Sequence, residues 1–145
     1  MSLPLIVAIA IIAFAAAFHL HWGLGGRLGY SVSLPQRTDG EPVMSHRIGW
    51  WRPAALGVTL GLILLGALAL AAAGRLALPL SASTARMILI PVGAAFILRA
   101  FAPTPWTGFF KRIRHTRWAR YDSWLYSPLF LLLGLSLLAI ALRSP

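Results

Sequence analysis

Four long apolar runs constrain this chain more than any other feature. They cover about residues 3–22, 53–74, 84–102 and 123–142. A helix needs about 20 apolar residues to cross the ~30 Å hydrocarbon core of a bilayer, and each run is close to that length. We therefore predict an all-α, polytopic membrane protein in which residues 1–145 form one domain, an antiparallel four-helix transmembrane bundle.

The composition excludes the main alternatives. Of the 145 residues, 59 % are hydrophobic and 11 % are charged, and the mean hydropathy is +0.78. Soluble domains carry roughly a quarter charged residues, so neither a soluble enzyme nor a disordered tail fits. The absence of cysteine excludes disulfides, thiolate metal sites and cysteine nucleophiles. No Lys or Arg precedes the first run, so we expect a retained span and not a signal peptide.

The third run predicts an ion pair inside the bundle. Only 12 residues separate Arg86 from Arg99, which is about 18 Å of helix and too short to cross a bilayer. The helix must therefore extend through both arginines, and Arg99 then needs a counter-ion near the membrane interior. The chain has only three carboxylates, and Asp122 precedes the fourth run. We hypothesise an Arg99–Asp122 pair; the alternative is that Asp122 only caps the fourth helix.

The basic residues are shared unevenly between the two ends of the predicted bundle. The loops after the first and third runs hold nine of them: Arg27, Arg37, Arg47, Arg52, Lys111, Arg112, Arg114, Arg117 and Arg120. The opposite end holds three: Arg75, Arg86 and Arg143. The positive-inside rule makes the richer loops cytoplasmic and both termini periplasmic or extracellular. The preference for Arg over Lys and the alanine content suggest a bacterium, so we expect the bacterial inner (cytoplasmic) membrane.

Small residues predict how the first two helices pack. Gly57 and Gly61 form a GxxxG pattern in the second run, and Ala13 and Ala17 repeat at the same spacing in the first. Such faces let membrane helices approach closely. We expect them to join the two helices within one chain more often than to form a dimer.

His19 and His21, near the end of the first run, are the candidate cofactor ligands. On a helix they point about 200° apart, so they cannot hold one metal ion together. Two interpretations stay open. One histidine ligates a haem or contacts a quinone with help from another helix, or both lie at the membrane interface and bond to water or backbone. No metal-site spacing occurs, and the sequence identifies no cofactor.

Segments rich in aromatic and basic residues adjoin the second and fourth runs. Such residues favour the lipid headgroup zone, with rings inward and arginines on anionic phosphates. On a helical projection one face, which Arg117 and Arg120 interrupt, holds Trp106, Phe109, Phe110, Ile113, Tyr121 and Trp124. Because spans hold these segments at the membrane, we expect anionic membrane lipids and no nucleic acid as partners. The predicted headgroup contacts are Trp50, Trp51, Arg52, Trp106, Lys111, Arg112, Arg114, Arg117 and Arg120.

Several motifs together resemble those of a known family. They are Gly108-Phe109-Phe110-Lys111-Arg112, Thr116-Arg117-Trp118-Ala119-Arg120, Asp122, Tyr126-Ser127-Pro128, Leu98-Arg99-Ala100 and the stretch from His19-Leu20-His21-Trp22 to Gly26. Over nearly the full chain they resemble the DUF3995-type proteins, a bacterial family of four-helix membrane proteins of unknown function. The resemblance implies the fold and the membrane location but no activity, substrate or cofactor. It singles out His19, Trp22, Arg99, Asp122 and Tyr126.

On the predicted topology those five residues lie at one surface of the membrane. We therefore expect them to form a polar pocket at the bundle mouth, with a purely structural lock as the alternative. The predicted function is non-enzymatic: the protein binds lipid or a hydrophobic small molecule, or is an accessory subunit of a membrane-protein partner or homo-oligomer. The alternative is a redox protein with a haem or quinone at His19 or His21. A channel or transporter is disfavoured, because the spans contain few polar residues.

Overall fold

The chain is a bundle of long apolar helices. The computed structural model describes residues 1–44 and 50–143, and within these ranges it contains helices and loops but no strand. Its long helices are α1 (Leu3–Gly23), α2 (Trp51–Ala72), α3 (Ala82–Phe101) and a continuous helical segment, Arg117–Ala141. All four are long and apolar enough to cross a membrane. The predicted all-α membrane fold is confirmed.

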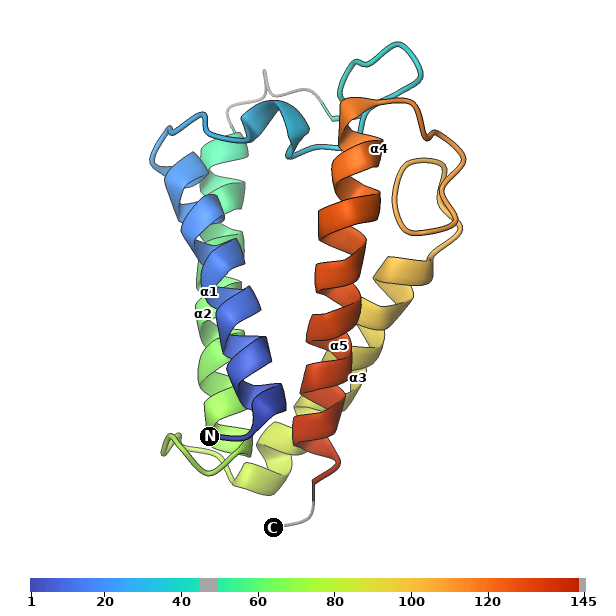
Figure 1. Cartoon of the computed structure of the whole chain (residues 1–145). Coiled ribbons are helices and arrows are strands. Elements are labelled where there is room, and N and C mark those ends of the chain that lie inside the picture. The colour runs from blue at the N-terminus through green and yellow to red at the C-terminus, as the bar shows by residue number, and fades with distance from the viewer. Residues whose placement is uncertain (45–49, 144–145) are drawn as a thin grey trace.

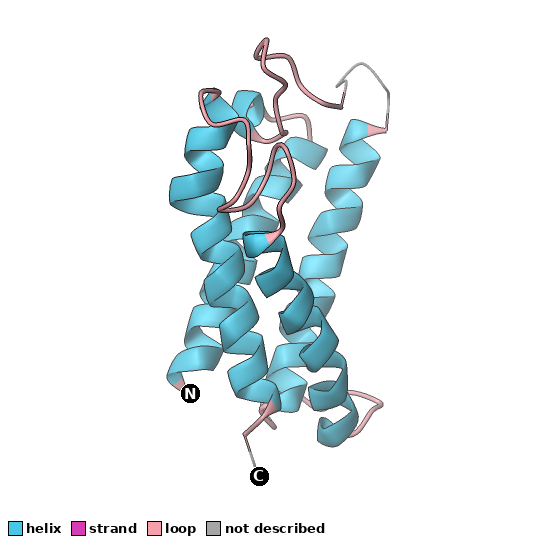
Figure 2. Cartoon of the chain, turned by 90° about the vertical axis from the view of Figure 1, so that its right-hand side faces the viewer, coloured by secondary structure: helices cyan, strands magenta, loops and turns pink. Residues whose placement is uncertain are grey.

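Consecutive long helices run in opposite directions through the bundle. In Figure 1, α1 rises from the N-terminus, α2 descends, α3 rises and α5 descends to the C-terminus, so both termini lie at one end. Figure 2 shows the two longest loops gathered at the other end. These are the loops after α1 and α3, which carry most of the basic residues. The two loops that are richest in basic residues therefore lie at one end of the molecule.

The fourth membrane helix begins earlier than predicted. It starts with α4 (Arg117–Tyr121), passes through a π-helical turn, η2 (Asp122–Tyr126), and continues as α5 (Ser127–Ala141). The predicted start at residue 123 is wrong, because the Thr116 side chain caps the helix by accepting a hydrogen bond from the amide of Ala119 at 3.1 Å. Asp122 is consequently inside the helix and does not cap it.

Two closely packed helix pairs form the bundle. The extensive interfaces are α3 with α5 and α1 with α2. At the α3–α5 crossing, Gly93 and Gly134 face each other so closely that a Cβ on Gly134 would lie 2.6 Å from the carbonyl oxygen of Gly93. Backbones approach this closely only where both residues lack a side chain. This crossing fixes α3 against α5.

The GxxxG prediction for α2 is wrong. A Cβ built on Gly57 or Gly61 would meet no atom within 4 Å, so neither glycine lies at a helix contact. Close packing of α1 on α2 occurs elsewhere along α2, where Gly66 faces Ile9 and Ile12 of α1. The spacing is present, but neither glycine is in contact with another helix of the described chain.

The buried core lies toward the end that holds the termini. It includes Leu5, Ala8, Ala72, Leu89 and Leu137, from all four membrane helices. Toward the loop end the two pairs are less closely packed, and a short 3₁₀ turn, η1 (Tyr30–Val32), covers the gap beside α4. The loop end is therefore where the bundle has room for a site.

Candidate functional site

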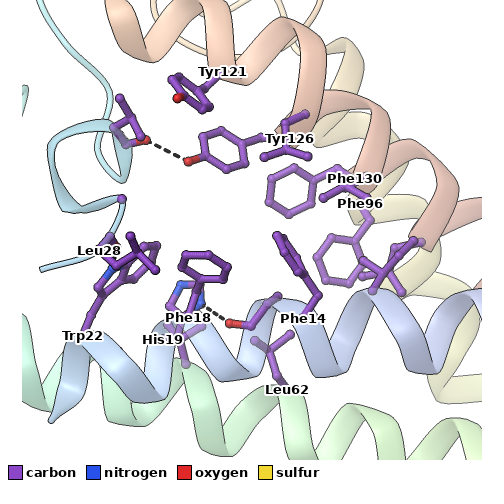
Figure 3. Close-up of a pocket in the computed structure, with 18 of the residues that line it drawn as sticks. Phe14, Phe18, His19, Trp22, Leu28, Leu62, Phe96, Tyr121, Tyr126 and Phe130 are labelled. Atoms are coloured by element: carbon purple, nitrogen blue, oxygen red, sulfur yellow. Dashed lines mark hydrogen bonds between the residues drawn. The ribbon is translucent and has the colours of Figure 1, made fainter. Parts of the chain in front are cut away.

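A cavity of about 760 Å³ lies between the two helix pairs, in the half of the bundle nearer the long loops. Its wall consists largely of aromatic and aliphatic side chains from α1, α2, α3 and α5, closed at the loop end by residues 28–32. Figure 3 shows the aromatic rings of α1 facing those of η2 and α5 across this space. The aromatic lining residues are Phe14, Phe18, Trp22, Phe96, Tyr121, Tyr126 and Phe130.

On α1 the aromatic wall follows from helical spacing. Phe14, Phe18 and Trp22 are four residues apart and therefore share one face of the helix. Their rings contact in sequence, with centroids 5.0 Å apart for the first pair and 5.7 Å for the second. His19 packs edge-on against Trp22 at 5.0 Å. The cavity thus has a continuous aromatic side, one helix face wide.

Polar groups in the wall are mostly bonded to backbone. The Nδ1 of His19 bonds to the carbonyl oxygen of Ala15 at 2.8 Å. The Trp22 indole donates to the carbonyl of Leu28 at 2.7 Å, and the Tyr126 hydroxyl donates to the carbonyl of Val32 at 3.0 Å (Figure 3). The last two bonds hold the first loop over the cavity, so they define its closed end.

A second polar feature lies at the junction of α3 and the fourth membrane helix. Asp122 is fully buried, and its carboxylate accepts four hydrogen bonds. Arg99 Nη2 lies 2.8 Å from Oδ1, and the Lys111 ammonium lies 3.0 Å from Oδ2. The amide of Gly108 at 2.8 Å and the Ser127 hydroxyl at 3.2 Å also donate to Oδ2. We name these five residues the Asp122 cluster.

Local backbone geometry explains why this cluster forms. The π turn brings the amide of Ser127 onto the carbonyl of Asp122, so the two side chains also meet. Gly108 has a φ of +87°, a conformation that favours glycine, and a Cβ there would approach the carbonyl of Ala102 to 2.8 Å. This turn brings the 102–116 loop back against the end of α3, where its amide and Lys111 reach Asp122.

Phe130 separates the two features. The Arg99 guanidinium lies 4.7 Å from the centroid of the Phe130 ring, which also lines the cavity. Cation–π contact is worth more where water is excluded, so this stacking helps to hold Arg99 beside the bundle interior. Phe130 thus contacts the cluster through Arg99 and also lines the cavity, which Arg99 itself does not line.

The structure divides the predicted polar pocket into two places. His19, Trp22 and Tyr126 line the cavity, whereas Arg99 and Asp122 do not and instead form the expected ion pair. The prediction that all five converge on one pocket is wrong. The fourth helix presents Tyr126 toward the cavity and Asp122 toward α3, a division that sequence spacing alone does not show.

Lys111 is the clearest correction among the predicted headgroup contacts. The residue is 2 % exposed, and its ammonium group bonds to Asp122, Ser123 and the Gly108 carbonyl. A buried carboxylate is stable only when its charge and oxygen atoms are paired. Arg99 pairs with Oδ1 of Asp122, and Lys111 pairs with Oδ2. The 102–116 loop is also not helical, so the projected amphipathic face does not form there.

The other predicted headgroup residues are more exposed than Lys111, and all but two of them are exposed. Trp51 and Trp106 are half-buried, and Trp51 packs against Trp22 and Tyr30. Arg47, which was counted only for the charge of the first loop, lies outside the described residues. Those that are exposed at the loop end are Trp50, Arg52, Arg112, Arg114, Arg117 and Arg120.

His21 differs from His19 in position. Its Nε2 accepts a hydrogen bond from the amide of Leu28 at 3.2 Å, and it does not line the large cavity. Within residues 1–44 and 50–143, no group of three His, Cys, Asp or Glu side chains is placed to hold a metal ion. Of the two histidines, only His19 lines the large cavity.

Sequence reasoning missed most of the cavity wall. Phe14 and Phe18 carried a readable signal, because with Trp22 they form an aromatic stripe at helical spacing. Phe96 and Phe130 carried none, since they stack across two helices at 5.6 Å and are distant in sequence. Their shared role depends on how α3 meets α5.

The fold and the site together define a small multi-pass membrane protein. It has an aromatic cavity between its membrane-spanning helices and a separate buried ion cluster. Residues 8–137 match the family described as "Protein of unknown function (DUF3995)". Because this match covers most of the chain, the protein belongs to that family, as its motifs suggested. No curated protein and no solved structure gives a significant match.

Proposed function

We propose that this protein is a non-enzymatic membrane protein that binds one hydrophobic small molecule in the aromatic cavity. The observation that carries the proposal is the cavity itself. Its volume of about 760 Å³ lies within the ~300–1,000 Å³ typical of small-molecule sites. A wall of aromatic rings with few polar groups is also the usual composition of such sites.

The packing around the cavity supports a binding role over a structural one. Helix bundles fill their interiors closely, and an unfilled space costs the dispersion contacts of its lining. Here the terminal half of the bundle is closely packed, whereas the loop half leaves the rings of α1 and α5 apart. A bound apolar molecule would restore those contacts.

The experiment uses two glycines of α2 as a matched pair. Gly57 and Gly61 are one turn apart, and a Cβ added at either meets no atom within 4 Å, but only Gly61 lines the cavity. We expect Gly61→Phe to fill the space and to weaken binding of monopalmitoylglycerol, a long-chain probe without charge, at least tenfold. Gly57→Phe should bind it like the parent protein.

Native mass spectrometry in mild detergent measures this binding. The same method, applied to protein extracted from its own membranes, shows whether a discrete mass is retained. Equal binding of monopalmitoylglycerol by the parent and by both folded variants would contradict the proposal, as would a parent protein that binds none.

A second candidate is a redox protein with a haem or quinone beside His19. The observation that favours it is that the His19 ring lines the cavity while its Nδ1 is bonded to backbone, which leaves Nε2 as the ring's other nitrogen. Absorption spectra of the gently extracted protein test it. A haem or quinone band that is lost in His19→Ala supports this candidate, and a colourless, quinone-free protein contradicts a tightly bound cofactor.

We also propose that the basic loops face the cytoplasm of a bacterial cell, with the protein in the inner membrane. The support is the charge asymmetry of the sequence: nine basic residues belong to the loops after the first and third runs, and three belong to the opposite end. A carboxyl-terminal alkaline phosphatase fusion should be active, because that enzyme folds outside the cytoplasm. A fusion that is inactive, while a cytoplasmic reporter at the same position is active, would reverse the orientation.

A further inference from the structure

We propose that the occupant of the aromatic cavity is an anionic phospholipid, which inserts one acyl chain from the membrane leaflet at the loop end and places its phosphate at Arg117. This inference rests on the proposed binding function and names the class of ligand. Depth, polarity, charge and access each support it independently.

The depth of the cavity matches one leaflet. On α1 the lining extends from Trp22 at the loop end to Ile11. At 1.5 Å per residue this is about 16 Å, close to half of the ~30 Å hydrocarbon core. A single acyl chain that stays in its own leaflet has this reach, whereas a ligand that crosses the bilayer does not fit.

The lining changes from polar to apolar along that depth. Ser31, Arg117 and the hydroxyl-bearing Tyr121 belong to the segments nearest the loops. Ile11, Leu65 and Leu133 line the deeper part of the same cavity. An amphiphile whose head lies at the loop end and whose tail points toward the bilayer centre matches this order.

The charge of the cavity lining favours a lipid headgroup with a net negative charge. Of the described residues that line the cavity, Arg117 alone carries a permanent charge, and none is a carboxylate. On the other side of Trp22 a smaller hollow of about 480 Å³ is lined by Arg27 and Arg52. Guanidinium groups bind phosphate through paired hydrogen bonds. A phosphate is therefore well placed here, and a choline or ethanolamine head finds no carboxylate in the wall.

The way into the cavity favours a bilayer lipid over a free fatty acid. Phe14, Val58 and Gly61 line it and are exposed within membrane-spanning segments, and we infer that the space opens sideways toward lipid between these residues. A chain enters through this opening without leaving its leaflet. Ser31 and Tyr121 add hydroxyl groups for ester and glycerol oxygens, which a free fatty acid lacks.

The test compares ligands with the same palmitoyl chain and different heads. We expect the full-length protein in mild detergent to bind palmitoyl lysophosphatidylglycerol about tenfold more tightly than palmitoyl lysophosphatidylcholine, as one charged hydrogen-bonded contact predicts. Arg117→Gln should abolish this preference, because it weakens binding of the glycerol lipid more than binding of the choline lipid, whose quaternary ammonium already offsets its phosphate charge. Arg120→Gln is the matched control, because Arg120 is an exposed arginine of the same short helix that does not line the cavity.

Each of the other possible outcomes contradicts one defined part of the proposal. Equal binding of the two lysolipids by the parent, or equal loss of the preference in both arginine variants, contradicts recognition of an anionic head at Arg117 while cavity binding stands. Tighter binding of palmitate than of lysophosphatidylglycerol reassigns the ligand to free fatty acid. A parent protein that binds none of the probes, including monopalmitoylglycerol, contradicts the binding function itself.

Discussion

The helical segment Arg117–Ala141 has two contrasting sides. On the α3 side, Gly134 packs against Gly93 without space between them, and Asp122 has four hydrogen-bond donors. On the α1 side, Tyr126 and Phe130 face a cavity of about 760 Å³, and few bonds cross it. One side of the same helix is fully packed and bonded, and the other is left open.

This difference separates stability from binding. A buried carboxylate with two cations and a glycine-on-glycine crossing leave no room for a ligand, so we assign the α3 side to holding the fold. Aromatic rings around a space at membrane depth gain dispersion contacts when an apolar molecule fills it. We therefore assign the α1 side to the proposed lipid, and the variants below test whether the two sides are independent.

The largest expected effect comes from Asp122→Asn. The change keeps the shape of the side chain but leaves the buried Lys111 and the partly buried Arg99 without their counter-charge, so we expect a loss of about 3–5 kcal/mol of unfolding free energy. Unfolding in a mixed-micelle SDS titration measures it. Asp39→Asn, at an exposed turn, is the control and should change little. A fully stable Asp122→Asn protein would refute the structural role of the cluster.

Gly134→Ala should destabilise the bundle less. Its methyl group would overlap the Gly93 carbonyl at 2.6 Å, and such overpacking costs about 1–3 kcal/mol. The comparison is Gly57→Ala, where space is open and helix propensity favours alanine, so that variant should be as stable as the parent or more so. The same SDS titration applies. If both variants unfolded alike, the α3–α5 side would not be the packed side.

Tyr126→Phe should have the smallest effect and should sharpen the contrast. It removes the hydrogen bond to the Val32 carbonyl, worth about 0.5–1.5 kcal/mol, while keeping the ring in the cavity wall. We expect faster proteolysis in the first loop with little change in global unfolding. Tyr121→Phe removes a hydroxyl from an exposed ring and serves as the control. Equal protease sensitivity of the two variants would mean that this bond does not hold the loop.

Hydropathy and charge predicted those features of the protein that a membrane environment requires. The four spans follow from run length, since a helix that crosses lipid must be long and apolar. The Arg99–Asp122 pair was predictable because an arginine within a span needs a counter-ion and the chain has few carboxylates to supply one. Both are constraints that a sequence expresses locally.

The remaining features depend on which helix faces meet. Gly93 and Gly134 lie on separate helices and form no spacing pattern, whereas the visible GxxxG at Gly57 and Gly61 faces open space. The sequence predicts Lys111 to be a surface cation, but in the structure a turn at Gly108 brings its ammonium group to Asp122. The cavity is missed for the same reason, because it is defined by the separation of two helix pairs.

Photolabelling of the cavity tests the central claim most directly. A palmitoyl lysophosphatidylglycerol with a photoreactive group at the end of its chain is crosslinked to the protein in bilayers, and the labelled residues are identified by mass spectrometry. The account predicts label at the deep lining residues Ile11, Leu65 and Leu133, and its loss in Gly61→Phe but not in Gly57→Phe. Label spread evenly over the exposed outer residues Leu60, Ile63 and Leu98, with no enrichment in the cavity, would contradict it.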